Sequence, residues 1–130
     1  MSHYFTREEA EALLPAISVV LRSIQETRVS IRAVEDELEA ARMGSMSNGH
    51  HLHEGALKLQ QELATLLRAL RTQLSKLQEF GCELKDADTG LIDFLSLRDG
   101  QEVYLCWRLG EDRIRFWHYL DTGFAGRQPL

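Results

Sequence analysis

The chain has 130 residues, of which 44% are hydrophobic and 27% charged, and its formal net charge is −5. This length predicts one domain over residues 1–130, and the acidic balance argues against nucleic acid or an anionic membrane as a partner. The N-terminus lacks the pattern of a secretory leader and no apolar run approaches ~18 residues, so we expect no membrane span and a cytoplasmic location.

A long amphipathic helix is predicted over residues 6–43. Thr6 and Glu9 have the spacing of a capping box. Pro15 lies inside the helical pattern and lacks a backbone donor, so we expect either a kink near it or a short first helix. The residues expected to be buried recur at alternating intervals of four and three, and they are Leu13, Ile17, Val20, Ile24, Thr27, Ile31, Val34 and Leu38.

A second helix is predicted over residues 51–80, after a turn-forming loop at 44–50. Gly81 follows its last turn, where a glycine commonly ends a helix. The same four-three spacing resumes, and the residues expected to be buried are Leu52, Ala56, Leu59, Leu63, Leu66, Leu70, Gln73 and Leu77.

Two such helices joined by a short loop predict an antiparallel, coiled-coil-like hairpin. Two helices alone cannot shield both sides of a leucine stripe of this length. We therefore expect a homodimer in which two hairpins form a four-helix bundle. The alternatives are that the rest of the chain folds back along the hairpin, or that the stripe binds another protein.

The hydrophobic period changes from 3.6 to 2 after Gly81, which predicts an antiparallel β-meander of three to four strands and an α+β fold. Asp99-Gly100 is a two-residue turn signal, and it predicts that Phe94 lies opposite Leu105. The expected strands cover residues 82–85, 91–97, 102–109 and 113–120.

The register of the last strand depends on the turn before it. Taking Gly110-Glu111 as a two-residue turn places Phe116 and His118 on the same apolar face as Leu105. His118 is then either a hydrogen-bonded core residue or part of a site with a nearby carboxylate.

The other face of the predicted sheet mixes aromatic, arginine and carboxylate side chains, as binding surfaces do. The alternative is that this face packs on a helix or on a second protomer. In the tail, residues 121–130, Phe124 is expected to dock and Arg127 to pair with a carboxylate or an anion. The candidate binding residues are Asp93, Glu102, Tyr104, Cys106, Arg108, Arg115, Trp117, His118, Asp121 and Arg127.

Other reactive side chains give weaker signals. His50, His53 and Glu54 have the composition of a metal site, but we prefer a mobile polar loop as their explanation, because adjacent histidines at a loop-to-helix junction cannot all turn to one ion without a formed cage. Cys82 and Cys106 are too few for a disulfide framework, so we expect reduced thiols. The sequence contains no phosphate loop, nucleophile elbow or paired Cys-x-x-Cys, so it identifies no catalytic residue and no cofactor.

The sequence resembles a family of uncharacterised prokaryotic proteins known as domain of unknown function 2203. The resemblance implies a cytoplasmic bacterial or archaeal protein, and it implies no activity, so no catalytic role is transferred to any position. The matching stretches are Phe5-Thr6-Arg7-Glu8-Glu9-Ala10, Leu13-Leu14-Pro15, Gly81-Cys82, Lys85-Asp86, Gly90-Leu91-Ile92-Asp93-Phe94, Val103-Tyr104-Leu105-Cys106-Trp107, Trp117-His118 and Gly123-Phe124-Ala125-Gly126-Arg127.

Two functional hypotheses follow from the sequence. The first is a non-enzymatic, homodimeric module that binds a protein or a small molecule through the mixed sheet face and the tail. The second is a metal- or anion-dependent enzyme, or a ligand site, at the sheet edge and tail. The predicted register disfavours the second hypothesis, because it places His118 on the opposite face from Asp93 and Cys106.

Overall fold

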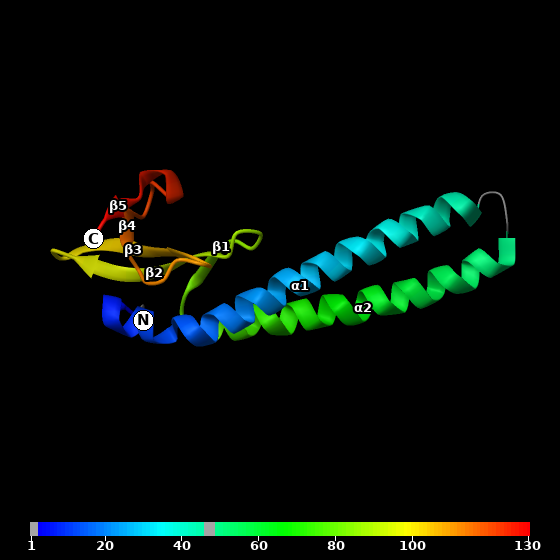
Figure 1. Cartoon of the computed structure of the whole chain (residues 1–130), viewed down its shortest axis with the longest axis horizontal. Coiled ribbons are helices and arrows are strands. Elements are labelled where there is room, and N and C mark those ends of the chain that lie inside the picture. The colour runs from blue at the N-terminus through cyan, green and yellow to red at the C-terminus, as the bar shows by residue number, and fades with distance from the viewer. Residues whose placement is uncertain (1–2, 46–48) are drawn as a thin grey trace. The chain divides into compact units, whose positions relative to one another are not determined.

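The computed structural model of the protein describes residues 3–45 and 49–130, with side chains for residues 3–44 and 54–130. Two packed helices precede a five-stranded antiparallel sheet, which confirms the predicted α+β class (Figure 1). The chain forms two compact units. We call the residues up to Ser23 together with Ser75–Leu130 the sheet unit, and Ile24–Leu74 the hairpin unit.

The helices are α1, Arg7–Ser45, and α2, Gly49–Glu79. The predicted capping box is confirmed, since the Thr6 N–H donates to Glu9 Oε1 at 3.2 Å and the Glu9 N–H donates to Thr6 Oγ1 at 3.1 Å. Helix α1 continues through Pro15, so the alternative of a short first helix is wrong. Within the described residues, neither helix is long and apolar enough to cross a membrane.

The buried residues of α1 differ from the predicted seam in its first turns. Leu14 and Leu21 are buried, whereas Leu13 and Val20 keep part of their surface exposed. This part of α1 belongs to the sheet unit. The predicted seam is the stripe of a helix that packs on other helices, and a helix that also covers a sheet buries a different stripe.

The sheet has the strand order β1-β2-β3-β4-β5. The fifth strand was not predicted, and it forms because the tail returns along β4 and pairs Gln128 with Trp117. A short 3₁₀ helix, η1, Phe124–Gly126, precedes it. The strands are β1, Glu83–Asp86; β2, Leu91–Arg98; β3, Gln101–Arg108; β4, Phe116–Tyr119; and β5, Gln128–Pro129.

The predicted register of β2 and β3 is confirmed. Phe94 pairs with Leu105, and Asp93 pairs with Cys106. Asp99-Gly100 has φ angles of 52° and 78°, so both central residues of the turn occupy the left-handed region that a type I′ turn requires.

The predicted register of β4 is wrong. Cys106 pairs with Phe116, and Tyr104 pairs with His118, so the β3–β4 connection holds an odd number of residues instead of two. A shift of one residue turns every side chain of a strand to the opposite face. His118 and Phe116 therefore lie on the face of Cys106, and Trp117 lies on the face of Leu105.

Glu111 shapes this connection. The Trp107 indole N–H donates to the Glu111 carbonyl at 3.1 Å, and the Arg108 N–H donates to Glu111 Oε1 at 2.7 Å. Ile114, predicted to be a strand residue, is buried within the connection instead, and its N–H donates to Glu11 Oε1 of α1 at 3.3 Å. The longer path around Glu111 produces the observed register.

The start of α1 covers one face of the sheet and the tail lies against the other (Figure 1). On the α1 side, the Phe5 N–H donates to Leu95 O at 2.8 Å, the Ser96 hydroxyl donates to Phe5 O at 2.6 Å, and the Phe5 and Phe94 ring centroids are 5.1 Å apart. On the tail side, the Arg108 guanidinium lies 5.5 Å from the Phe124 ring centroid. Side chains between the strands and the tail are therefore enclosed.

Candidate functional site

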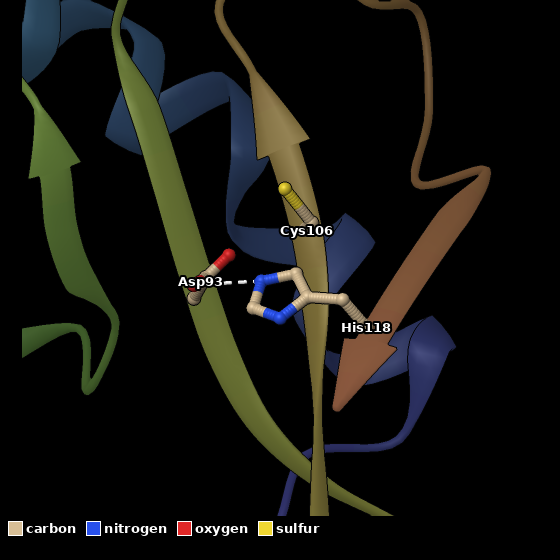
Figure 2. Close-up of side chains that lie close together, drawn as sticks. All are labelled: Asp93, Cys106 and His118. Atoms are coloured by element: carbon tan, nitrogen blue, oxygen red, sulfur yellow. Dashed lines mark hydrogen bonds and ion pairs between the residues drawn. The ribbon is translucent and has the colours of Figure 1, made fainter. Parts of the chain in front are cut away.

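Three candidate residues from three neighbouring strands meet on the tail side of the sheet. Asp93 comes from β2, Cys106 from β3 and His118 from β4, and their potential metal-ligating atoms all lie within 4.8 Å of one another (Figure 2). They are 2%, 1% and 1% exposed. The observed β4 register places His118 on the same face as Asp93 and Cys106. The predicted register had placed it on the opposite face, which was the reason for disfavouring a site there.

The His118 imidazole is held from both sides. Nδ1 lies 2.7 Å from the Tyr119 carbonyl oxygen, and Nε2 lies 3.0 Å from Asp93 Oδ2 (Figure 2). Because a carbonyl oxygen only accepts, Nδ1 carries a hydrogen and donates it to Tyr119. The contact between Nε2 and the carboxyl then contains one shared proton, carried either by the imidazole or by Asp93.

Burial sets the protonation of the cluster. It raises the pKa of the Asp93 carboxyl, although the adjacent His118 acts in the opposite direction. Burial, together with the charge of Asp93, also raises the pKa of the Cys106 thiol to about 12. The Cys106 thiol therefore keeps its proton at neutral pH.

One atom of the cluster lacks a conventional partner. Asp93 Oδ1 is buried, and no N–H or O–H donor among the described residues reaches it. The Cys106 thiol, a weak donor, interacts with the same carboxyl group. A buried carboxylate oxygen without a strong donor is unusual, because burial without a partner destabilises the fold.

Tyr104 borders the cluster. Its ring centroid lies 5.5 Å from that of His118, and Lys85 Nζ lies 4.8 Å from the Tyr104 centroid. A hydrogen bond from the Tyr104 hydroxyl to the Glu83 carboxylate, together with burial, raises the pKa of Tyr104 to about 12. The phenol therefore stays protonated at neutral pH and acts as part of the wall.

Arg127 and Glu111 attach the tail to the sheet. Arg127 Nη2 donates to both Glu111 carboxylate oxygens, at 2.8 and 2.9 Å, and both side chains are largely buried. The guanidinium also lies 4.0 Å from the Phe116 ring centroid and 4.8 Å from that of Phe124. We call Arg127 and Glu111 the tail clamp.

The role of Glu111 was not predicted from the sequence. Gly110-Glu111 was expected to form a two-residue turn, where a glutamate is an ordinary solvent-facing residue. The only available signal was the long interval between the apolar runs of β3 and β4, and a two-residue turn with a longer strand explained that interval equally well.

The remaining candidates lie apart from the cluster. Trp117 is buried on the α1 face, with the Arg98 guanidinium 4.7 Å from its ring centroid. Arg115 pairs with Asp112 at 3.1 Å on the surface. The exposed candidates are Glu102, Arg108 and Asp121, and Glu54 is also exposed, whereas the side chains of His50 and His53 lie outside those described.

Both cysteines are free and buried, as the sequence analysis expected of reduced thiols. Cys82 directly precedes Glu83, the β1 residue that pairs with Asp93, but its Sγ lies 3.7 Å from the Leu77 carbonyl oxygen of α2 and is not part of the cluster. Burial raises the pKa of its thiol to about 11. Neither thiol is accessible as a nucleophile in the folded chain.

Comparison with known proteins gives one family. The family model described as "Uncharacterized conserved protein (DUF2203)" matches residues 3–130. Curated proteins and solved structures give no match. This match covers the helices, all five strands and the tail, and the chain therefore belongs to the DUF2203 family.

Proposed function

We propose that this protein is a non-enzymatic binding module that acts as a cytoplasmic homodimer, with the helical hairpin as its assembly surface. The observation that carries the proposal is the exposure of α2 within the hairpin unit. Every residue from Glu54 to Leu74 keeps an exposed or half-exposed surface, including the leucines of the predicted seam.

The two helices of the hairpin unit are covered unequally. On α1, Ile24, Ile31 and Val34 are buried. On α2, Leu57 and Leu67 are 47% and 44% exposed. A stripe of leucines that one neighbouring helix covers only in part is typical of a helix that has a second neighbour in a four-helix bundle. A second copy supplies such a neighbour through a two-fold axis.

Two properties of the sheet unit support a binding role over catalysis. Cys106 is enclosed and holds its proton, and the His118 ring nitrogens are both engaged. Part of the predicted binding surface is exposed at the tail, where Phe124 is 44% exposed beside Arg108. Arginine and aromatic side chains are enriched where proteins bind partners, so we assign partner contacts to this surface.

The dimer is tested by sedimentation or light scattering of the native chain at micromolar concentration, compared with Leu67→Glu. We expect the native chain to have twice the chain mass and Leu67→Glu to be a folded monomer. Leu57→Glu is the matched control. Leu57 has similar exposure, but at 3.6 residues per turn it points about 80° further from the seam, so this variant stays dimeric. A monomeric native chain contradicts the proposal.

A further inference from the structure

We propose that Asp93, Cys106 and His118 form a binding site for a divalent transition metal ion of the zinc class. The ligands are a carboxylate oxygen of Asp93, Sγ of Cys106 and Nε2 of His118. Carboxylate, thiolate and imidazole are the three ligand types that protein zinc sites use, and a thiolate disfavours calcium and magnesium. The site is independent of the dimer proposed above.

The distances in the cluster suit one ion. Bonds of about 2.0–2.3 Å in a tetrahedral zinc site place the ligand atoms about 3.3–3.8 Å from one another. His118 Nε2 and Asp93 Oδ2 are 3.0 Å apart, and all three ligand atoms lie within 4.8 Å of one another. Side-chain movements of about an ångström therefore complete the three-ligand set. The fourth position of the ion is left for water or another donor.

The surroundings orient two of the ligands. Nδ1 of His118 donates to the Tyr119 carbonyl oxygen at 2.7 Å, which directs Nε2 toward Asp93. A metal-ligating histidine usually makes this kind of hydrogen bond through its other nitrogen, because the bond fixes the tautomer and the ring plane. Asp93 Oδ1, buried and without an N–H or O–H donor in the described part of the chain, is a second free ligand atom.

The ligand set matches the charge of a divalent ion. A thiolate is the form of cysteine that ligates zinc, so metal binding displaces the proton of the Cys106 thiol. The thiolate and the Asp93 carboxylate together then balance the two positive charges of the ion, and the buried site avoids the large unfavourable free energy of an uncompensated buried charge.

The test uses Co²⁺ as a spectroscopic probe for the zinc class, added to the purified full chain under reducing conditions after treatment with a chelator. We expect one Co²⁺ per chain, visible d–d bands of a tetrahedral site and a thiolate-to-cobalt charge-transfer band in the near ultraviolet. Added Zn²⁺ removes these bands. Cys106→Ser abolishes the charge-transfer band, and the matched control Cys82→Ser retains it.

Two further variants distinguish Co²⁺ binding at this site from binding elsewhere in the chain, and loss of a ligand from loss of folding. Asp93→Asn preserves the side-chain shape and, with an unchanged far-ultraviolet circular dichroism spectrum, weakens Co²⁺ binding roughly tenfold or more. The double variant His50→Gln/His53→Gln binds Co²⁺ as the native chain does. A pH indicator reports release of the Cys106 proton when the native chain binds Co²⁺.

Three results overturn the proposal. The first is a native chain that gives no charge-transfer band. The second is a band that survives in Cys106→Ser or disappears in Cys82→Ser. The third is Co²⁺ binding that depends on His50 and His53 while folded Asp93→Asn binds with native affinity. Proton release measures the native chain alone, so its result stands even if Cys106→Ser fails to fold.

Discussion

The imidazole Nε2 of His118 lies 3.0 Å from Oδ2 of Asp93, and both side chains are almost completely buried. The two residues are 25 positions apart in sequence and belong to strands separated by β3. Their contact depends on the register of β4, because a shift of one residue would turn the imidazole toward α1. The pair therefore joins β2 to β4 across β3 through a single polar interaction.

Replacing His118 should strongly destabilise the protein. His118→Ala removes the partner of a buried carboxyl and leaves a cavity, and we expect the free energy of unfolding to fall by about 3–5 kcal/mol in urea denaturation. His3→Ala is the control, because His3 is exposed and contacts the Glu9 carboxylate and, edge to face, the Phe5 ring without being buried itself. Equal stability of the two variants would show that the buried pair contributes nothing.

Gly81 should be sensitive to any side chain. Its φ is +89°, and an added Cβ would lie 2.8 Å from Cζ of Phe5. Gly100 has a similar φ of +78° but open space around it, so Gly100→Ala reports backbone strain alone. We expect Gly100→Ala to lower the free energy of unfolding by about 1 kcal/mol and Gly81→Ala by about 2–4 kcal/mol. Equal losses in urea denaturation would show that Phe5 moves away at little cost.

Structural features that depend on residues close in sequence were predicted correctly, whereas features that depend on contacts between distant residues were not. The β2–β3 register was predictable, because the turn at Asp99-Gly100 and the alternation beside it are local. The β4 register was not, because it depends on side-chain contacts of Glu111 and on a hydrogen bond between Ile114 and Glu11, 103 positions apart. The candidate residues were therefore identified from their chemical types, but the sequence could not show that Asp93, Cys106 and His118 lie together.

The tail clamp should control how readily the tail opens. Glu111→Gln keeps the side-chain shape but removes the charge that Arg127 pairs with, and a partly buried charged hydrogen bond contributes about 1.5–3 kcal/mol. We expect the Leu130 amide, which donates to Arg115 O at 2.9 Å, to exchange its hydrogen roughly tenfold to a hundredfold faster.

The neighbouring residue provides the control for this measurement. Asp112→Asn is the same kind of substitution one position away, and it removes only a surface pair with Arg115. Hydrogen exchange followed by NMR should show native protection of Leu130 in Asp112→Asn. If Glu111→Gln is protected to the same extent, the tail is held by β5 pairing and aromatic packing alone.

The Cys82 thiol should make stability fall at alkaline pH. Burial, opposed in part by a backbone hydrogen bond and assisted by the charge of Glu83, raises the pKa of this thiol to about 11 in the folded chain, against about 8.5 when unfolded. Its contribution is therefore complete below about pH 8.5 and is lost as the pH rises toward 11, because the unfolded chain releases the proton first. Between about pH 7.5 and pH 9.5 this difference lowers the free energy of unfolding by about 1 kcal/mol.

The measurement is urea denaturation of the native chain and Cys82→Ala at both pH values, with reductant present. Other titrating groups affect both proteins alike, so the native chain should lose about 1 kcal/mol more than Cys82→Ala over this interval. An equal loss in the two proteins would mean that the thiol ionises in the folded chain as easily as in the unfolded one. That result would require solvent to reach Cys82 at the junction of α2 and β1, where its side chain is buried.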